Sequence, residues 1–80
     1  MKWRRGTILI PREGKNKIVA KYEVKQYEKG SKYGINGGRI SKLWVTMDDK
    51  TVMNYDRGWD IEPKTEEEKI CLSILLNDYN

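Results

Sequence analysis

Residues 17–28 alternate between apolar and polar side chains, and no other feature constrains the fold as strongly. Ile18, Ala20, Tyr22 and Val24 occupy one set of positions, while lysine and glutamate residues occupy most of the other. Successive side chains of a β-strand point to opposite faces, so the pattern predicts a strand with one buried and one solvated face. A sheet built from such strands needs a second layer to cover its apolar face.

Two later segments have the same period of two and complete a predicted antiparallel meander over residues 17–57. Residues 39–47 place Leu43, Val45 and Met47 on one face, and residues 51–55 return as a strand after the polar turn at 48–50. Residues 1–16 are predicted to form a basic N-terminal arm or strand, with one or two short strands in residues 1–10 and a turn at 11–14.

Near residue 65 the period changes to that of a helix, predicted over residues 65–78. Thr65 and Glu68 have the spacing of a capping box, which marks a helix start. Apolar residues then recur at helical spacing: Ile70, Cys71, Leu72, Ile74, Leu75, Leu76 and Tyr79. This arc must be buried, and the apolar face of the sheet is the surface available. We therefore predict one α+β domain over residues 1–80, a small antiparallel sheet of three to five strands packed against a C-terminal α-helix.

The composition excludes several classes of protein. Of the 80 residues, 38% are hydrophobic, 35% are charged and two are proline, so a collagen-like or wholly disordered chain is excluded. The single cysteine, Cys71, cannot form a disulfide within the chain, and its apolar neighbours predict a buried free thiol. The apolar runs are too short for a signal peptide or a membrane span, so we expect a cytoplasmic protein with no membrane partner.

The residues that most enzymes need are scarce. The chain has no histidine, so the commonest general base and the commonest zinc ligand are missing. Its three serines lack a histidine partner, and no nucleophile-elbow motif is present. The aspartates of residues 48–60 are as readily turn formers and caps as weak Mg²⁺ ligands. We therefore expect a protein that is not an enzyme and holds no metal or cofactor.

A glycine-rich connector spans residues 29–38. Its spacing differs from both the phosphate-binding loop and the dinucleotide-binding fingerprint, and a predicted strand follows it instead of a helix. Two interpretations remain for it. In the first, its backbone amides, near Lys32 and Arg39, bind an anion as a nest. In the second, its glycines only adopt the positive φ angles of a bulged hairpin, with Asn36-Gly37 as a type I′ turn.

Positive charge and aromatic residues are interleaved in the first half of the chain. Residues 1–42 contain twelve basic and three acidic residues, a net charge of +9, while residues 43–80 have a net charge of −5. Aromatic platforms flanked by cations bind single-stranded nucleic acids or nucleotides. The candidate anion-binding residues are Lys21, Lys25, Tyr27, Lys32, Tyr33, Arg39, Lys42 and Trp44. The alternative is that the lysines solvate the outer face of the sheet and protect its edges.

The segment 54–60 is a second candidate site. Arg57 lies between Asp56 and Asp60, which favours an ion pair that fixes the turn. Trp59 either folds back over the core or is exposed as an anchor, and an exposed Trp–Arg pair is typical of a protein-binding hot spot. Arg57 and Trp59 are therefore the candidate partner-binding residues.

The stretches GSKYGINGGRISKLW (residues 30–44) and NYDRGWD (residues 54–60) resemble a family of small uncharacterised proteins from Firmicutes and their phages and mobile elements. The likeness covers roughly residues 17–80. It implies a setting in the bacterial host cell but no activity. By analogy, short chains from such elements are often regulators or inhibitors of host defence.

Three hypotheses follow. The first is a non-catalytic binding protein that recognises nucleic acid or a nucleotide ligand. The alternative is a protein-interaction module, like an anti-CRISPR protein, that inhibits a host nuclease or defence complex. The third is a homodimer that associates through the wide apolar arc of the helix.

Overall fold

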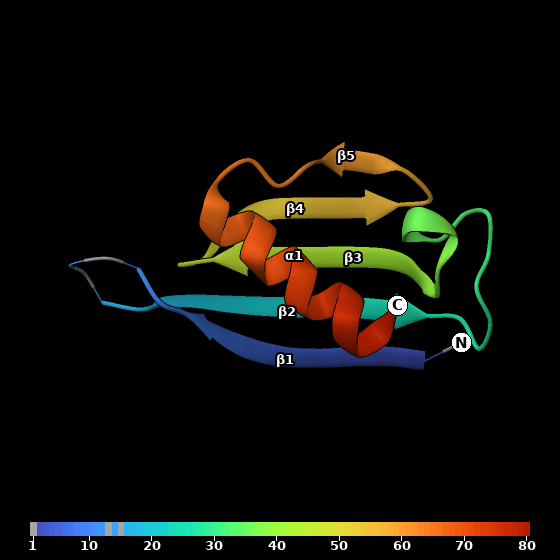
Figure 1. The fold of residues 1–80 in the computed structure, drawn as a ribbon, viewed down its shortest axis with the longest axis horizontal. Coiled ribbons are helices and arrows are strands. Elements are labelled where there is room, and N and C mark those ends of the chain that lie inside the picture. The colour runs from blue at the N-terminus through green and yellow to red at the C-terminus, as the bar shows by residue number, and fades with distance from the viewer. Residues whose placement is uncertain (1, 13, 15) are drawn as a thin grey trace.

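The computed structural model describes residues 2–12, 14 and 16–80, and it consists of an antiparallel sheet with one helix across it (Figure 1). The strands lie in chain order: β1 (Lys2–Ile10), β2 (Ile18–Gln26), β3 (Ile40–Met47), β4 (Lys50–Asp56) and β5 (Trp59–Ile61). The helix α1 (Glu66–Tyr79) crosses the sheet, and a short 3₁₀ turn, η1 (Ile35–Gly37), lies between β2 and β3. This confirms the predicted α+β meander, with five strands.

The N-terminal segment, predicted as an arm or strand, forms one strand that is longer than the short strands expected. The nine residues of β1 pair with β2 without interruption, from Lys2 opposite Gln26 to Ile10 opposite Ile18. Ile8 and Ile10 supply apolar positions two residues apart, so the strand joins the same core as β2. The turn predicted at 11–14 includes Glu13, which lies outside the described residues.

The core lies between the sheet and α1. The apolar positions predicted for β2 and β3 are buried or half-buried there, and Cys71 and Leu75 of α1 are fully buried against them. Cys71 is a free thiol, as expected, and its burial raises its pKa from 9.0 to about 11. A thiol that resists ionisation is a packing residue and not a nucleophile.

The helix begins where the capping box predicts. The Thr65 Oγ1 accepts a hydrogen bond from the Glu68 N–H at 3.1 Å, and the Glu68 carboxylate accepts one from the Lys64 N–H at 2.8 Å. The apolar arc is narrower than predicted, because Ile70 and Ile74 are 47% and 36% exposed. A single helix that packs on a sheet contacts it along one stripe of side chains. In α1 that stripe consists of Cys71, Leu75 and their half-buried neighbours, and Ile70 and Ile74 lie outside it.

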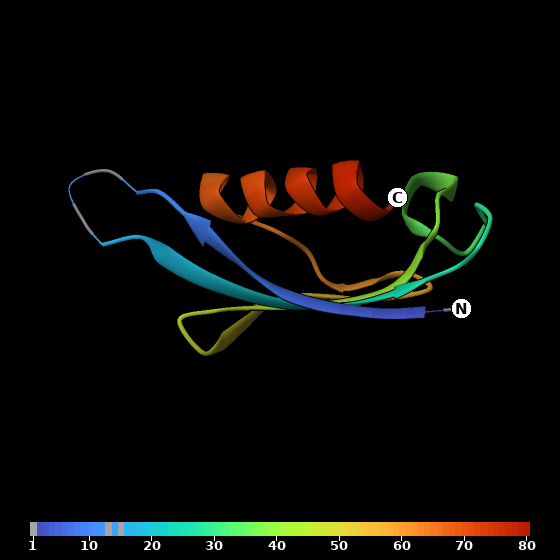
Figure 2. The same cartoon turned by 90° about the horizontal axis from the view of Figure 1, so that it is seen from below.

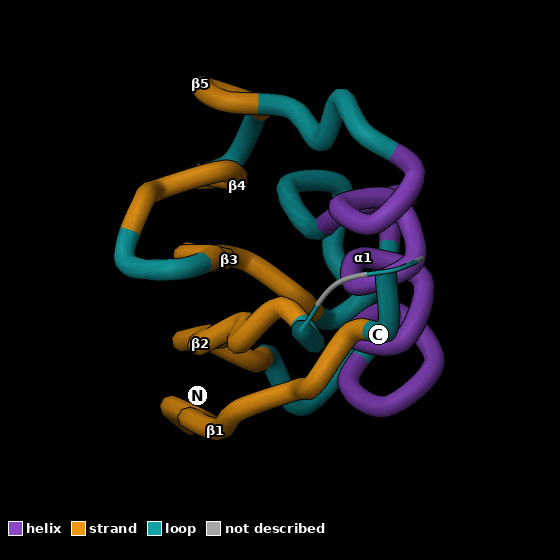
Figure 3. Tube along the Cα trace, turned by 90° about the vertical axis from the view of Figure 1, so that its left-hand side faces the viewer, coloured by secondary structure: helices purple, strands orange, loops and turns teal. Residues whose placement is uncertain are grey.

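The other side of the sheet has no element over it in the described part of the chain. Seen along the plane of the sheet, α1 and the β2–β3 connection both lie on one side (Figure 2), and the view along the strands shows the same (Figure 3). We call the uncovered side of β1–β4 the open face. Its central side chains are Trp3, Arg5, Thr7, Lys21, Glu23, Lys25, Lys42, Trp44, Asn54 and Asp56.

Candidate functional site

Cross-strand pairing arranges the open face in rows. One row runs Trp3, Lys25, Lys42 and Asp56, and the next runs Arg5, Glu23, Trp44 and Asn54. Residues directly opposite each other on neighbouring strands have Cβ atoms roughly 5 Å apart, so each side chain can contact the next one in its row. The rows bring residues from β1 and β3, far apart in the sequence, onto one surface.

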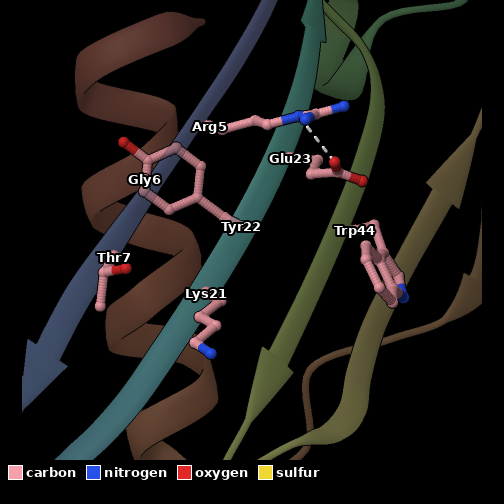
Figure 4. A pocket seen from close by; sticks show the side chains of 7 residues that line it. All are labelled: Arg5, Gly6, Thr7, Lys21, Tyr22, Glu23 and Trp44. Atoms are coloured by element: carbon pink, nitrogen blue, oxygen red, sulfur yellow. Dashed lines mark ion pairs between the residues drawn. The ribbon is translucent and has the colours of Figure 1, made fainter.

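Trp44 stands near the centre of this surface. Its side chain is 44% exposed, and its Nε1 donates a hydrogen bond to Thr51 Oγ1 on β4 at 3.2 Å. That bond holds the ring toward β4 and leaves a flat side turned toward β2 (Figure 4). A half-exposed tryptophan held in one orientation offers a ready stacking surface.

Two hollows adjoin Trp44. The larger, of about 400 Å³, is lined by Arg5, Gly6, Thr7, Lys21, Tyr22, Glu23 and Trp44 (Figure 4). The smaller, of about 180 Å³, is lined by Trp3, Glu23, Lys42, Leu43, Trp44, Asn54, Tyr55 and Asp56. Both hollows share Glu23 and Trp44, so the two residues lie between them.

The charges on the open face leave a positive excess. The Arg5 Nε lies 2.8 Å from Glu23 Oε1, and the Lys42 Nζ lies 3.7 Å from Asp56 Oδ2. Among the described residues Lys21 and Lys25 make no ion pair, and the Lys25 Nζ lies 5.6 Å from the centroid of the Trp3 ring. The face therefore combines exposed aromatic rings with cations whose charge is not fully neutralised.

Only half of the eight predicted anion-binding residues come together. Lys21, Lys25, Lys42 and Trp44 share the open face. Tyr27 and Arg39 lie beyond the end of β2, where the Arg39 Nε donates to the Tyr27 carbonyl at 3.0 Å. These two line a separate hollow of about 210 Å³ with Lys2, Arg4, Gln26 and Glu28. Lys32 and Tyr33 lie in the β2–β3 connection.

The two motifs that carry the family resemblance contact each other. The cationic groups of Lys32 and Arg57 both lie over the Tyr33 ring, 5.1 and 5.6 Å from its centroid. The Tyr55 hydroxyl donates to the Tyr33 carbonyl at 2.8 Å. Residues 30–44 and 54–60 therefore pack against each other, and the contacts from the end of β4 and the β4–β5 turn fix the position of the β2–β3 connection.

The ion pair predicted for Arg57 is wrong for the described residues. Asp56 lies opposite Lys42 in the sheet and pairs with it, so Arg57 places its guanidinium over the Tyr33 ring. Trp59 is half-buried and packs edge-on against Tyr55, with ring centroids 5.1 Å apart. Of the two interpretations of Trp59, the structure has the ring folded over the core.

The β2–β3 connection uses many of its own amides. The N–H groups of Ser31, Gly34, Gly37 and Gly38 all donate to carbonyls within the connection. Asn36 and Gly37 have φ angles of 53° and 72°, and the Gly38 N–H closes the turn onto the Ile35 carbonyl, as a type I′ turn requires. Amides engaged in this way are not free to bind an anion, which favours the interpretation of the connection as a bulged hairpin over that of an anion-binding nest.

Six of the ten residues of the face were not among the predicted site residues, and three of these bear on its chemistry most directly: Trp3, Arg5 and Glu23. Trp3 and Arg5 occur at alternating positions with Thr7, which is the signal of a strand face. The alternation alone does not assign these residues to a site, because only the pairing of β1 with β2 places Arg5 opposite Glu23.

The fold and the open face define a class: a small α+β domain with one covered sheet face and one basic, aromatic face. The model of a family described as a domain of unknown function (DUF7678) matches residues 2–80, and the chain belongs to that family. The match includes β1, whereas the sequence resemblance covers only residues 17–80, approximately.

No curated protein and no solved structure matches the chain. Of the helices in the described residues, none has the length and apolar character to cross a membrane. The described residues also contain no group of three or more histidine, cysteine or acidic side chains placed to hold a metal ion.

Proposed function

We propose that this protein is a non-catalytic module that binds single-stranded nucleic acid on the open face of its sheet. The observation that supports the proposal is Trp44, half-exposed and held in place between two hollows, with Arg5, Lys21 and Lys25 around it. Sheets that bind single strands stack bases on such rings and neutralise the phosphates with neighbouring cations.

The layout of the face favours a single strand over a duplex. Trp3 and Trp44 lie in neighbouring rows on β1 and β3, two strands whose axes are roughly 10 Å apart by the spacing of paired strands. Stacking on these rings needs bases whose flat faces are free, and in a duplex those faces are covered by neighbouring base pairs. Lys25 lies on β2, between the strands that carry the two rings, and Lys42 lies beside Trp44 on β3; both can contact phosphates that link stacked bases.

The first test is fluorescence anisotropy with labelled eight-nucleotide single strands and duplexes, at low and physiological salt. We expect Trp44→Leu to weaken single-strand binding about tenfold or more, because stacking contributes about 1–3 kcal/mol per base. Trp44→Phe keeps an aromatic face and is expected to retain most of the affinity. Lys42→Glu is expected to weaken binding and flatten its salt dependence, since each phosphate contact adds about −0.7 to the slope.

Lys69→Glu is the matched control, because it makes the same charge change on an exposed position of α1, away from the open face. It is expected to lower affinity far less than Lys42→Glu does. No binding by the wild type, or binding that is insensitive to salt, would rule the proposal out.

The alternative is a module from a phage or mobile element that binds a host nuclease or defence complex in the bacterial cytoplasm. An exposed tryptophan with a neighbouring arginine also suits a protein-binding hot spot, and Trp44 and Arg5 share one hollow. In this alternative the open face again makes the contact, because Arg57 and Trp59 are engaged within the protein. A pull-down from nuclease-treated host lysate separates the two: a protein that wild type retains and Trp44→Leu loses favours the alternative.

A further inference from the structure

We infer that the larger hollow beside Trp44 takes a guanine base, and that Glu23 recognises it. The inference deepens the proposed function and rests on it. Stacking on Trp44 alone accepts any base, because every base has a flat face. Selection among bases needs hydrogen-bonding groups at a fixed place beside the stacking ring, and the hollow provides them.

Glu23 lies where the edge of a stacked base would be. It pairs with Trp44 across β2 and β3, so the two side chains are neighbours on the open face. In Figure 4 the flat side of Trp44 faces the hollow, and Glu23 lies beside Trp44 at the end of the hollow where Arg5 stands. A base laid against Trp44 within the hollow therefore brings one of its edges to the Glu23 carboxylate.

The Glu23 carboxylate is paired with Arg5. Its Oε1 accepts from the Arg5 Nε at 2.8 Å, and its side chain is 31% exposed. A carboxylate has about four acceptor sites, and this ion pair occupies one of them. Glu23 lines the larger hollow, and in the described part of the chain no other ion pair engages its carboxylate. A carboxylate offers no donor with which to satisfy an acceptor on a base.

Guanine is the base that matches a group that only accepts. Its Watson–Crick edge carries two adjacent donors, the N1–H and the N2 amino group, which fit the two oxygens of one carboxylate. Adenine and cytosine place an amino donor beside an unprotonated ring nitrogen, and uracil places its donor between two carbonyls. Each of those edges brings an acceptor against the carboxylate, so Glu23 disfavours them. Arg5, whose side chain is 75% exposed, has further N–H donors for the guanine O6 or a phosphate.

The test uses labelled octauridylate in which one central position is uridine, adenosine, cytidine, guanosine or inosine. Uridine stacks weakly and forms no stable structure, so the central base reports on the hollow. We expect the guanosine oligonucleotide to bind about tenfold more tightly than the other three standard bases, as a bidentate contact discriminates by roughly that factor or more. Inosine lacks the N2 amino group and is expected to lose most of the advantage.

Variants of the two acidic residues on the face separate the inference from the proposed function. Glu23→Gln is expected to abolish the guanosine preference while binding to all-uridine octamer persists. Asp56→Asn, the matched control, removes the acid paired with Lys42 and is expected to keep the preference. Binding without a guanosine preference, or a preference that survives Glu23→Gln, overturns the inference and leaves the proposed function intact. If no oligonucleotide binds, the proposed function itself fails.

Competition by guanosine monophosphate identifies the source of the base. Displacement of the oligonucleotide at similar concentration means that the hollow takes a free nucleotide. Competition only at a concentration a hundredfold higher or more means that the base is read within a strand, with the lysines contacting its phosphates. Uridine monophosphate is the control, and it is expected to compete less well than guanosine monophosphate in both cases.

Discussion

Gly6 has a structural role that its place in a strand would not suggest. A Cβ at this position would lie 2.6 Å from Cζ and 2.8 Å from Cε2 of Tyr22, which packs beneath it. The Tyr22 ring has little freedom to move away, because its hydroxyl shares a hydrogen bond of 2.8 Å with the Tyr79 hydroxyl. That bond and partial burial raise the pKa of Tyr22 to about 12. Gly6, Tyr22 and Tyr79 thus join β1, β2 and α1.

We predict that Gly6→Ala lowers the free energy of unfolding by about 1–3 kcal/mol, the usual cost of an overpacked position. Urea denaturation followed by tryptophan fluorescence measures the change. Gly58→Ala is the matched control, because a Cβ there meets no atom within 4 Å, and it is expected to shift the midpoint little. Equal midpoints for Gly6→Ala and the wild type would mean that the Tyr22 ring can move aside without cost.

At the residue scale, the sequence predicts which face of a strand a side chain lies on better than it predicts which residue that side chain contacts. The alternation of residues 17–28 and 39–47 placed Lys21, Lys42 and Trp44 on the solvated face, because the period of a strand is fixed by backbone geometry. The partner of Arg57 could not be predicted in the same way. Its choice between a neighbouring carboxylate and Tyr33 depends on how the β2–β3 connection folds, and the period of the sequence says nothing about that.

At the element scale, Asn80 links the end of α1 to the β2–β3 connection. Its side-chain Oδ1 accepts from the Ile40 N–H at 3.0 Å, and its Nδ2 donates to the Ile35 carbonyl at 3.0 Å. Ile35 and Ile40 are both buried, so these backbone groups have little access to water. Gly38 leaves the space for this contact, since a Cβ there would overlap the Asn80 side chain.

We predict that Asn80→Ala lowers the free energy of unfolding by about 1–3 kcal/mol, because it removes the side-chain acceptor of the buried Ile40 N–H and one of the two donors to the Ile35 carbonyl. The amide protons of residues 30–40 are expected to exchange faster with solvent, as measured by NMR. Asn77→Ala, at an exposed position of the same helix, is expected to leave both quantities unchanged. Unchanged exchange in Asn80→Ala would show that the connection is held by its own turns and by Arg57 and Tyr55.

At the scale of the whole molecule, the sequence predicts a sheet that α1 covers on one face. It does not predict which side chains, from strands far apart in the chain, lie next to each other on the open face. The helical period of residues 65–78 identifies one covering element, which leaves one sheet face open. The composition of that face depends on the register of β1, and a nine-residue basic strand is readily taken for a solvated arm. Trp3, Arg5 and Glu23 could therefore be assigned to the site only from the paired sheet.

An 80-residue domain buries a small core, so a ligand that binds only the folded state adds visibly to its stability. At a ligand concentration a hundred times Kd, binding contributes about 2.7 kcal/mol to the free energy of unfolding. A domain of this size gains about 4–8 °C in Tm per kcal/mol, so we predict that the single-stranded oligonucleotide raises Tm by roughly 10 °C or more. Differential scanning fluorimetry measures the shift.

Two variants separate this effect from stability itself. Trp44→Leu, with little change in its own folding, is expected to lose most of the shift at the same oligonucleotide concentration, because the stacking surface is gone. Asn80→Ala is expected to melt at a lower temperature and still show the full shift, because its change lies in the joint between α1 and the β2–β3 connection and leaves the open face intact. The opposite pattern, a shift kept by Trp44→Leu and lost by Asn80→Ala, would move the binding site from the open face to the end of the molecule where Asn80 meets the connection.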